Sequence, residues 1–168
     1  MIKDETYFFH QTPEELCKKL IQMTPLESGD RVLEPFRGEG NFYNNLPSFV
    51  EKDWCEITDG RDYKDYTKPY DWVISNPPFK LNDGVKKENA FYKLLEYYLD
   101  RANKGVAFLG NDFCFSTLNP KRLKQINDKG WYIQNIVVSQ IKKWRGRYFW
   151  IIFQKKHNSF YKYIEGTY

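Results

Sequence analysis

Apolar residues recur along the chain at two different intervals, and these intervals predict helices and strands that follow one another. Residues 13–23 and 88–102 repeat apolar side chains every three or four positions, which predicts amphipathic helices. A shorter helix is expected over residues 119–129, closed by Gly130. Runs rich in aliphatic and aromatic residues predict strands at 31–34, 53–57, 71–75, 105–109, 135–139 and 147–154. This order predicts an α/β fold with a mostly parallel central sheet, flanking helices and an antiparallel hairpin at the edge.

Composition agrees with a soluble globular chain. The 168 residues are 41% hydrophobic and 29% charged, which suits one domain of ordinary size. No run approaches the ~18 apolar residues of a membrane-spanning helix, and the first residues lack the pattern of a secretory signal. Three cysteines and two histidines are scattered along the chain, so a structural metal site is not expected. We therefore expect a reduced, metal-free, cytoplasmic protein that does not bind a membrane.

Charge is distributed unevenly along the chain. Residues 1–100 hold 13 Lys and Arg against 19 Asp and Glu, whereas residues 101–168 hold 13 against 3. Aromatic residues reach 18%. A basic half with many aromatic rings favours a polyanion such as nucleic acid as partner, although lysine-rich surfaces also serve solubility.

The loop after the first predicted strand carries candidate ligand-binding residues, because α/β sheets bind ligands at the carboxyl ends of their strands. In the segment Glu34-Pro35-Phe36-Arg37-Gly38-Glu39-Gly40, the two glycines would let backbone approach a ligand closely. The spacing matches neither GxGxxG nor a P-loop. A carboxylate at Glu34 suits a ligand with a cationic group, such as an α-amino group. A tight strand-to-helix turn without a ligand explains the segment equally well.

A second carboxylate, Glu56, ends the next predicted strand and lies 22 residues after Glu34. In nucleoside-binding α/β folds, an acidic residue about 20 residues along accepts hydrogen bonds from ribose hydroxyls. Glu34 and Glu56 together therefore indicate an adenosine-containing ligand that carries an amino acid rather than a pyrophosphate. S-adenosylmethionine fits this description.

The segment Asn76-Pro77-Pro78-Phe79 follows directly after the apolar strand at 71–75. Because the prolines stiffen the chain and donate no hydrogen bond, the Asn76 side chain and the Pro77 carbonyl are left as fixed acceptors. Two acceptors that hold an exocyclic amino group would favour a pyramidal nitrogen whose lone pair faces an electrophile, and Phe79 would stack on the base. The alternative is a proline turn that simply ends the strand.

These segments carry a resemblance to a known family. VLEPFRGEGNF and DWVISNPPF resemble the cofactor-loop and catalytic motifs of S-adenosylmethionine-dependent N6-adenine methyltransferases, and residues 10–14 resemble the Thr-Pro segment that comes first in one subgroup. The resemblance spans residues 10 to 155. It implies a single Rossmann-like methyltransferase domain over residues 1–168, without a separate target-recognition domain. It also implies methyl transfer from S-adenosylmethionine to the N6 amine of adenine in nucleic acid, with DNA favoured over RNA.

The resemblance also implies roles for individual residues. Asn76 to Phe79 would hold the target amine, Glu34 the methionine moiety and Glu56 the ribose. Asp62-Tyr63 resembles the pair that binds the cofactor's adenine, although Asp65-Tyr66 has the same form. The implied cofactor site comprises Thr12, Pro13, Glu34, Pro35, Phe36, Gly38, Gly40, Glu56, Asp62, Tyr63 and Asn76.

The basic, aromatic stretch near the end is the expected nucleic-acid contact, since it combines cations for phosphates with rings for bases. Its residues are Lys142, Lys143, Trp144, Arg145, Arg147, Tyr148 and Phe149. Strand alternation allows only one of Tyr148 and Phe149 to face the target base. A solvated hairpin turn with ordinary core packing is the alternative.

Two other functions fit parts of the sequence. A protein glutamine N5-methyltransferase would use the same Asn-Pro-Pro-Phe segment, and a non-catalytic nucleic-acid-binding or scaffold subunit would use only the fold. A small chain of this kind would also suit a separate specificity subunit or a homo-oligomer.

Overall fold

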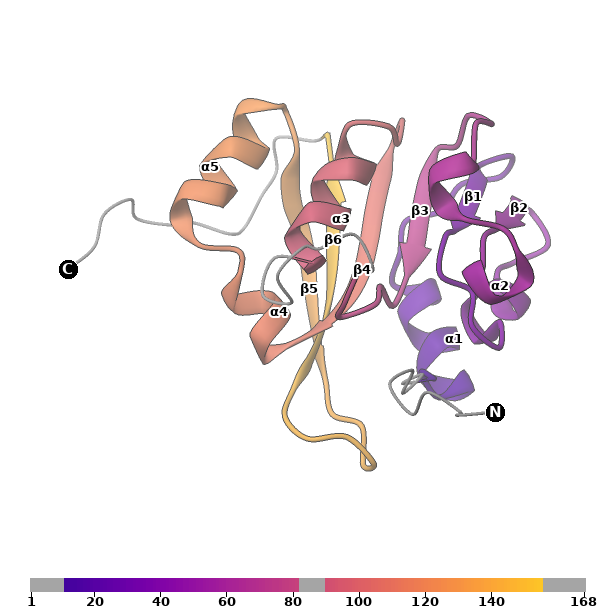
Figure 1. Ribbon diagram of the computed structural model, residues 1–168, viewed down its shortest axis with the longest axis horizontal. Coiled ribbons are helices and arrows are strands. Elements are labelled where there is room, and N and C mark those ends of the chain that lie inside the picture. The colour runs from indigo at the N-terminus through magenta and orange to yellow at the C-terminus, as the bar shows by residue number, and fades with distance from the viewer. Residues whose placement is uncertain (1–10, 82–89, 156–168) are drawn as a thin grey trace.

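The computed structural model describes residues 11–81 and 90–155, and its centre is a six-stranded sheet of order β2-β1-β3-β4-β6-β5 (Figure 1). The four strands from β2 to β4 pair in parallel, and β6 pairs antiparallel with both β4 and β5. The predicted mostly parallel α/β sheet is therefore confirmed. The strands are β1 (Arg31–Glu34), β2 (Glu51–Trp54), β3 (Trp72–Ser75), β4 (Gly105–Asn111), β5 (Tyr132–Ser139) and β6 (Tyr148–Gln154).

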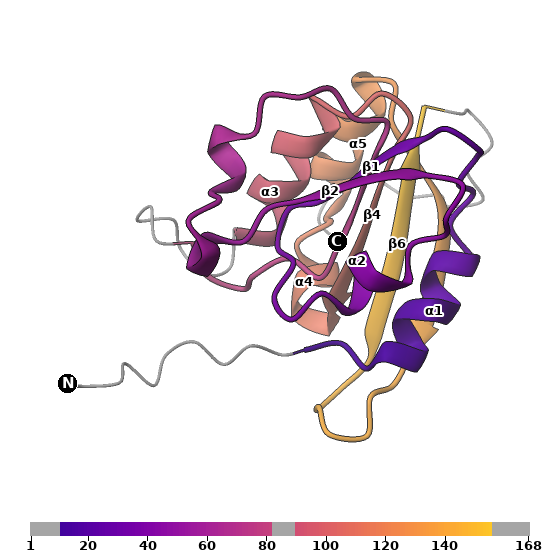
Figure 2. The ribbon, with the colours of Figure 1, turned by 90° about the vertical axis from the view of Figure 1, so that its right-hand side faces the viewer.

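Helices cover both faces of the sheet (Figure 2). α3 and α5 lie on one face and α1 on the other, which makes three layers. The helices are α1 (Glu14–Gln22), α2 (Asn41–Asn45), α3 (Ala90–Leu99), α4 (Asp112–Ser116) and α5 (Pro120–Asp128). Two 3₁₀ turns, η1 (Ile57–Asp59) and η2 (Tyr63–Asp65), connect β2 to β3. No helix in the described ranges is long and apolar enough to cross a membrane.

The core has one apolar cluster on each face of the sheet. Successive residues of β3 alternate between them: Val73 packs with α3, while Trp72 and Ile74 pack on the face of α1. Burial on both faces explains why this strand is apolar throughout, as parallel strands under two helical layers are. β6 is likewise buried along its whole length.

The expected antiparallel hairpin lies at the edge of the sheet. Its second strand, β6, lies between β4 and β5, so that β5 forms the edge. The burial patterns agree, because β5 has exposed and half-buried residues whereas every residue of β6 is buried. The loop between the two strands extends beyond the sheet at the bottom of Figure 1.

Element boundaries also differ from the expected ones. The second strand, expected at 53–57, ends at Trp54, because the side chain of Glu56 accepts a hydrogen bond from the Thr58 N–H and starts a 3₁₀ turn. α3 ends at Leu99 rather than 102, and its expected first residues, 88 and 89, lie outside the described residues. The short helices α2 and α4 were not predicted, since five residues are too few to show a helical period.

The order of the strands reverses direction at one point of the sheet, the switch point between β1 and β3. From β1 the chain continues outward to β2, and from β3 it continues outward to β4 in the opposite direction. At such a switch point the loops after the two central strands diverge, and ligands bind there. The carboxyl ends of β1 and β3, and hence Glu34 and Asn76, lie at this point, at the lower edge of the sheet in Figure 1.

Candidate functional site

Three segments that are far apart in the sequence meet at the switch point through Thr12. Asn76 Nδ2 donates a hydrogen bond to Thr12 Oγ1 at 3.3 Å. Asn41 Nδ2 donates to the Thr12 carbonyl at 2.8 Å. The structure therefore brings together the segment before α1, the residue after the glycine loop and the end of β3.

Glu34 is a buried carboxylate at the end of β1, and only 2% of its surface is exposed. It accepts a hydrogen bond from the backbone N–H of Tyr43, but within the described structure its Oε2 atom has no hydrogen-bond partner. Burial raises the pKa of Glu34 well above its ordinary value; Arg37 opposes this shift and Glu56 adds to it. A buried, unpartnered carboxylate oxygen is costly, and a cationic ligand group would complete its interactions.

The glycine loop curves tightly after β1. Gly38 has φ +54° and Gly40 φ +92°, in the left-handed region that favours glycine. Gly40 immediately precedes α2, whose first residue is Asn41. The Gly38 N–H donates to Glu56 Oε2 at 2.7 Å. The loop is therefore tied directly to the second predicted carboxylate.

Glu56 is buried at the point where β2 gives way to η1. Besides the bond from Gly38, its Oε1 accepts hydrogen bonds from Thr58, from the N–H at 3.1 Å and from the hydroxyl at 2.9 Å. These donors fix the carboxylate beside the glycine loop. The geometry agrees with a fixed acceptor for ligand hydroxyls.

Two arginines contact residues at the end of β2 and in the turn that follows it. The sequence did not predict these contacts. The guanidinium groups of Arg37 and Arg61 lie 3.8 and 4.0 Å from the ring centroid of Trp54. Arg37 also pairs with Asp59 at 2.6 Å, and Arg61 with Asp53 at 2.8 Å. No local sequence pattern predicts these contacts, because they join residues 7 to 22 positions apart.

Aromatic rings line the neighbouring loops. Phe36 meets Tyr63 edge-on at 5.2 Å, and Tyr63 meets Tyr97 of α3 at 5.4 Å. Asp62, which precedes Tyr63, is half-buried and accepts a hydrogen bond from the Lys64 N–H at 3.0 Å. Of the two Asp-Tyr pairs, the structure thus places Asp62-Tyr63 beside the glycine loop.

The alternative pair lies elsewhere. The Tyr66 hydroxyl donates to Asp53 at 3.2 Å and its ring packs against Tyr70 at 5.9 Å, while Asp65 is exposed. These contacts direct Tyr66 toward the start of β3 rather than toward Phe36.

The Asn-Pro-Pro-Phe segment leaves the sheet at the end of β3. Pro77 is buried, and Asn76, Pro78 and Phe79 are half-buried. The Phe79 ring packs against the apolar cluster on the α3 face of the sheet. Asn76 is therefore accessible next to a buried turn.

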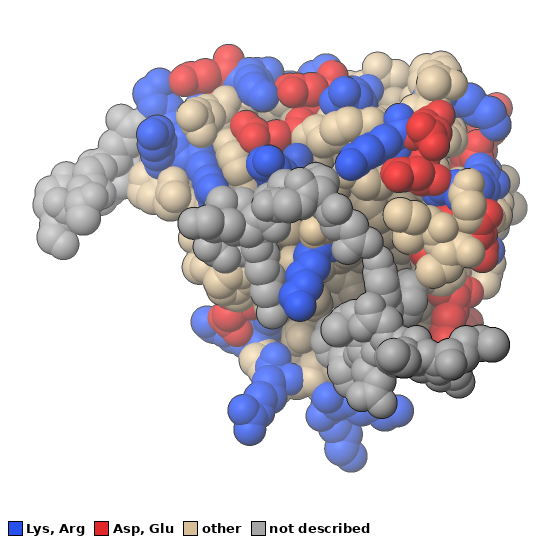
Figure 3. Space-filling view, viewed as in Figure 1, with Lys and Arg blue, Asp and Glu red and all other residues tan. Residues whose placement is uncertain are grey.

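The loop between β5 and β6 presents cations to solvent. Lys142, Lys143 and Arg145 are exposed, and the ring of Trp144 packs on Tyr148 at 4.9 Å. Figure 3 shows Lys and Arg side chains projecting at the lower end of the molecule, where Figure 1 places this loop.

Other residues of the expected nucleic-acid contact are engaged within the protein. The backbone N–H of Arg147 donates to Asp112 Oδ2 at 2.8 Å, and its side chain donates to Oδ1 from Nε at 3.0 Å and from Nη2 at 2.6 Å; these contacts, the backbone one first, lower the pKa of Asp112. Tyr148 and Phe149 are both buried, on opposite faces of the sheet. Phe149 lies on the face where Phe79 packs, stacked on Phe115 at 4.6 Å.

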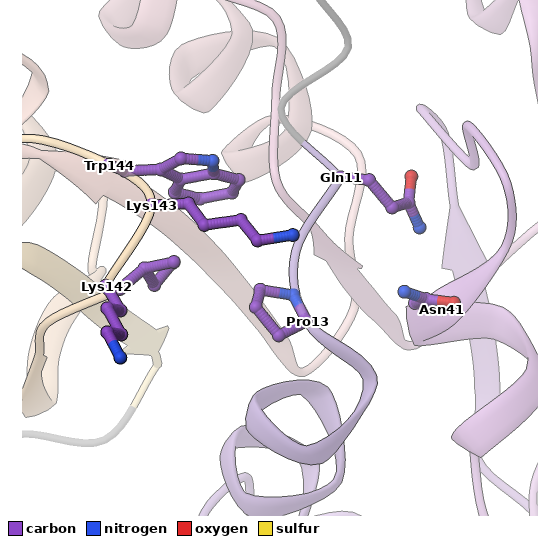
Figure 4. A pocket seen from close by; sticks show the side chains of 7 residues that line it. Gln11, Pro13, Asn41, Lys142, Lys143 and Trp144 are labelled. Carbon is purple, nitrogen blue, oxygen red and sulfur yellow. The ribbon is translucent and has the colours of Figure 1, made fainter.

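An open depression of about 400 Å³ separates this loop from the start of the described chain (Figure 4). Gln11, Pro13 and Asn41 form one wall. The opposite wall consists of Ile141, Lys142, Lys143 and Trp144. Pro13 and Asn41 flank Thr12 and the glycine loop, so the depression borders the site. Among the residues placed by the structure, no group of three or more His, Cys, Asp or Glu could hold a metal ion.

No protein-family model and no curated protein matches this sequence. Solved structures match the fold. A Listeria monocytogenes protein assigned to the class I S-adenosylmethionine-dependent methyltransferases aligns with a TM-score of 0.64 and 15% identity, over 90% of this chain and 62% of its own. TrmN from Thermus thermophilus aligns with a TM-score of 0.61 and 16% identity, over 86% of this chain and 49% of its own.

The modification subunit assigned to a type I restriction enzyme of Vibrio vulnificus YJ016 also aligns, with a TM-score of 0.61 and 13% identity, over 86% of this chain and 44% of its own. These structures establish the fold: the chain has the fold of the class I S-adenosylmethionine-dependent methyltransferases. It spans about half the length of TrmN and about 62% of the Listeria protein.

Glu34→Gln should raise the melting temperature of the ligand-free protein more at about pH 8 than at about pH 5. The folded-state pKa of Glu34 lies above its ordinary value of 4.5. Its contribution to stability is therefore complete below pH 4.5 and is lost as the pH rises through the folded-state pKa. The glutamine amide in Glu34→Gln does not ionise and so avoids this loss. Each kcal/mol of unfolding free energy corresponds to a shift of about 2–4 °C in melting temperature.

Thermal unfolding of the two proteins across this pH range measures the effect. Glu51→Gln, which changes an exposed carboxylate on β2, is the matched control and should leave the melting temperature nearly unchanged at every pH. A difference for Glu34→Gln that does not grow with pH would contradict the burial of an ionisable Glu34.

Proposed function

We propose that the protein transfers a methyl group from S-adenosylmethionine to the N6 amine of adenine in nucleic acid, with DNA favoured over RNA. The observation that carries this proposal is that Asn76 and Glu34 follow or end neighbouring parallel strands at the switch point, with Thr12 in contact with Asn76 and with no partner among the described residues for the buried Glu34 Oε2 atom. Asn76 suits an exocyclic amine, and Glu34 suits an ammonium group.

The residues around Glu34 fit S-adenosylmethionine. Glu34 would accept a hydrogen bond from the ammonium group of the methionine moiety. Its Oε2 atom has no hydrogen-bond partner among the described residues. Glu56 would accept hydrogen bonds from the ribose hydroxyls, and the glycine loop would pass close to the ligand. Phe36 and Tyr63 would contact the adenine ring, with Asp62 beside them. The bound cofactor supplies an electrophilic methyl group on a sulfonium.

At the target amine, the protein's task is positioning rather than strong base catalysis. Asn76 Oδ1 and the Pro77 carbonyl would each accept one N–H of the amine, so that its lone pair faces the methyl carbon. As the new N–C bond forms, the C–S bond breaks and the pair of electrons remains on sulfur. The nitrogen then loses one proton to solvent, which restores a neutral methylamino group.

The exposed cations of the β5–β6 loop favour nucleic acid as the substrate. Lys142, Lys143 and Arg145 are available for phosphates, and they border the depression that adjoins Thr12 and the glycine loop. The target base has to leave its stack to reach Asn76, so single-stranded or distorted nucleic acid is the easier substrate. Arg147 would support this loop through Asp112 rather than bind phosphate itself.

A protein glutamine amide would fit the same pair of acceptors, which makes glutamine N5-methylation the second candidate. The exposed basic loop beside the site favours a polyanion over a protein side chain. A non-catalytic scaffold would have no use for a buried carboxylate oxygen such as Glu34 Oε2, which has no hydrogen-bond partner among the described residues, because it costs stability without a ligand. A specificity subunit or a second copy of this chain would supply sequence selection.

Asn76→Ala should reduce methyl transfer by at least about 100-fold, since preorganised hydrogen-bonding groups contribute on this scale. Cofactor binding should remain near normal: S-adenosylhomocysteine at about 100 times its dissociation constant should still stabilise the variant by about 2.7 kcal/mol. The control is Asn135→Ala, which changes an exposed asparagine on β5. Turnover retained by Asn76→Ala would refute the assignment.

Charge reversal of Lys142, Lys143 and Arg145 to Glu should weaken nucleic-acid binding and reduce its salt dependence by about one unit of slope per lost phosphate contact. A matched control makes the same change in net charge at Lys121 and Lys124 of α5 and at Lys129, the residue that follows this helix. Binding titrations of both triple variants at several salt concentrations would distinguish the effect of the loop from the effect of net charge. Equal losses in both triple variants would show that net charge, rather than this loop, determines binding.

A further inference from the structure

Thr12 is held in place by contacts that do not involve its own side chain. Its carbonyl oxygen accepts hydrogen bonds from Asn41 Nδ2 at 2.8 Å and from the Cys17 thiol at 3.8 Å. The residue is only 3% exposed. Its hydroxyl is thereby fixed against Asn76, whose Nδ2 donates to it at 3.3 Å.

The orientation of the Asn76 amide matters because its two ends have opposite hydrogen-bonding character: Oδ1 accepts and Nδ2 donates. A target amino group donates its N–H bonds, so only the orientation with Oδ1 toward the target can hold it. The reverse orientation would place two donors against each other. In the structure Nδ2 is the end of the amide that contacts Thr12, so Oδ1 points away from Thr12.

We propose that Thr12 is a positioning residue whose hydroxyl selects the orientation of the Asn76 amide in which Oδ1 faces the target nitrogen. The proposal deepens the proposed function and rests on it. A hydroxyl has one proton to donate and two lone pairs that accept. Once that proton is donated to another acceptor, only the lone pairs remain for Asn76, and they accept from Nδ2 alone.

This arrangement links the two halves of the site. A carboxylate on the methionine end of the cofactor is an acceptor that the Thr12 proton can satisfy. When the carboxylate binds there, the Thr12 hydroxyl would donate its proton to it. The hydroxyl could then only accept from Asn76 Nδ2, which would hold the amide with Oδ1 toward the target nitrogen. Occupation of the cofactor site would thus prepare the amine site before the base arrives.

Two substitutions at Thr12 separate this role from a plain cofactor contact. Thr12→Val removes the hydroxyl with little change in shape, whereas Thr12→Ser keeps it. With cofactor and nucleic acid both saturating, Thr12→Val should lower kcat by about tenfold, the effect of about 1.4 kcal/mol at the transition state, and Thr12→Ser should retain kcat within about threefold. A raised KM for S-adenosylmethionine with unchanged kcat would overturn the proposal.

The Asn76→Asp background tests whether Thr12 acts through the amide. A carboxylate has two equivalent acceptor oxygens and therefore no wrong orientation. Adding Thr12→Val to this background should cost less than about twofold in kcat. A tenfold loss in both backgrounds would show that Thr12 acts by another route and would overturn the proposal.

A spectroscopic readout decides the question without turnover. In ¹⁵N-labelled protein bound to S-adenosylhomocysteine, the side-chain NH₂ signals of Asn76 should shift and exchange faster with water in Thr12→Val, and Thr12→Ser should restore them. Unchanged signals in Thr12→Val would overturn the proposal. Because this measurement needs no methyl transfer, it remains decisive even if the wild-type protein methylates nothing, an outcome that would refute only the proposed function.

Thr24→Val is the matched control for losing a buried threonine hydroxyl. The Thr24 hydroxyl donates to the Leu20 carbonyl at 2.9 Å and accepts from Trp150 Nε1 at 3.0 Å, within the core on the α1 face. This variant should melt at a lower temperature and keep the wild-type kcat and the Asn76 signals. A similar fall in kcat for Thr24→Val would attribute the effect of Thr12→Val to general destabilisation and would overturn the proposal.

Discussion

The carboxyl ends of β1 and β3 lie next to each other because β2 occupies the outer side of β1 and β4 the outer side of β3. This reversal of strand order is the constraint on which the rest of the site depends. It brings the end of β1, with the buried carboxylate of Glu34, next to the end of β3, where Asn76 follows. The segment before α1 brings Thr12 into contact with Asn76.

The two carboxylates of the site differ in how completely the folded chain satisfies them. Glu34 is buried, its Oε2 atom has no hydrogen-bond partner among the described residues, and burial disfavours its charged form until a cationic group arrives. Glu56, in contrast, is held by backbone and side-chain donors beside the glycine loop. This difference suits one carboxylate that pairs with a ligand charge and another that accepts hydroxyl groups. The proposed cofactor answers both requirements.

Short motifs in the sequence predicted the parts of the site that depend on local chain geometry. The sequence placed the glycine loop after β1 and the Asn-Pro-Pro-Phe segment after β3, and the structure has them there, because prolines, glycines and a buried strand restrict the backbone over a few residues. Contacts between distant side chains were not predictable in this way: neither the Arg37 contact with Trp54 nor the Arg147 pair with Asp112 leaves a local pattern. The sequence predicted the edge hairpin but not which of its two strands is outermost, because strand pairing depends on the whole sheet rather than on the strand itself.

The most direct test of the account is methyl transfer from labelled S-adenosylmethionine to duplex DNA, single-stranded DNA and RNA, followed by separation of the product nucleosides. The account predicts label in N6-methylated adenine nucleosides from the nucleic-acid pools, most strongly from single-stranded DNA. Label confined to protein glutamine would contradict it. No label in any pool, from protein that still binds S-adenosylhomocysteine, would also contradict it and would show that this chain alone does not methylate adenine.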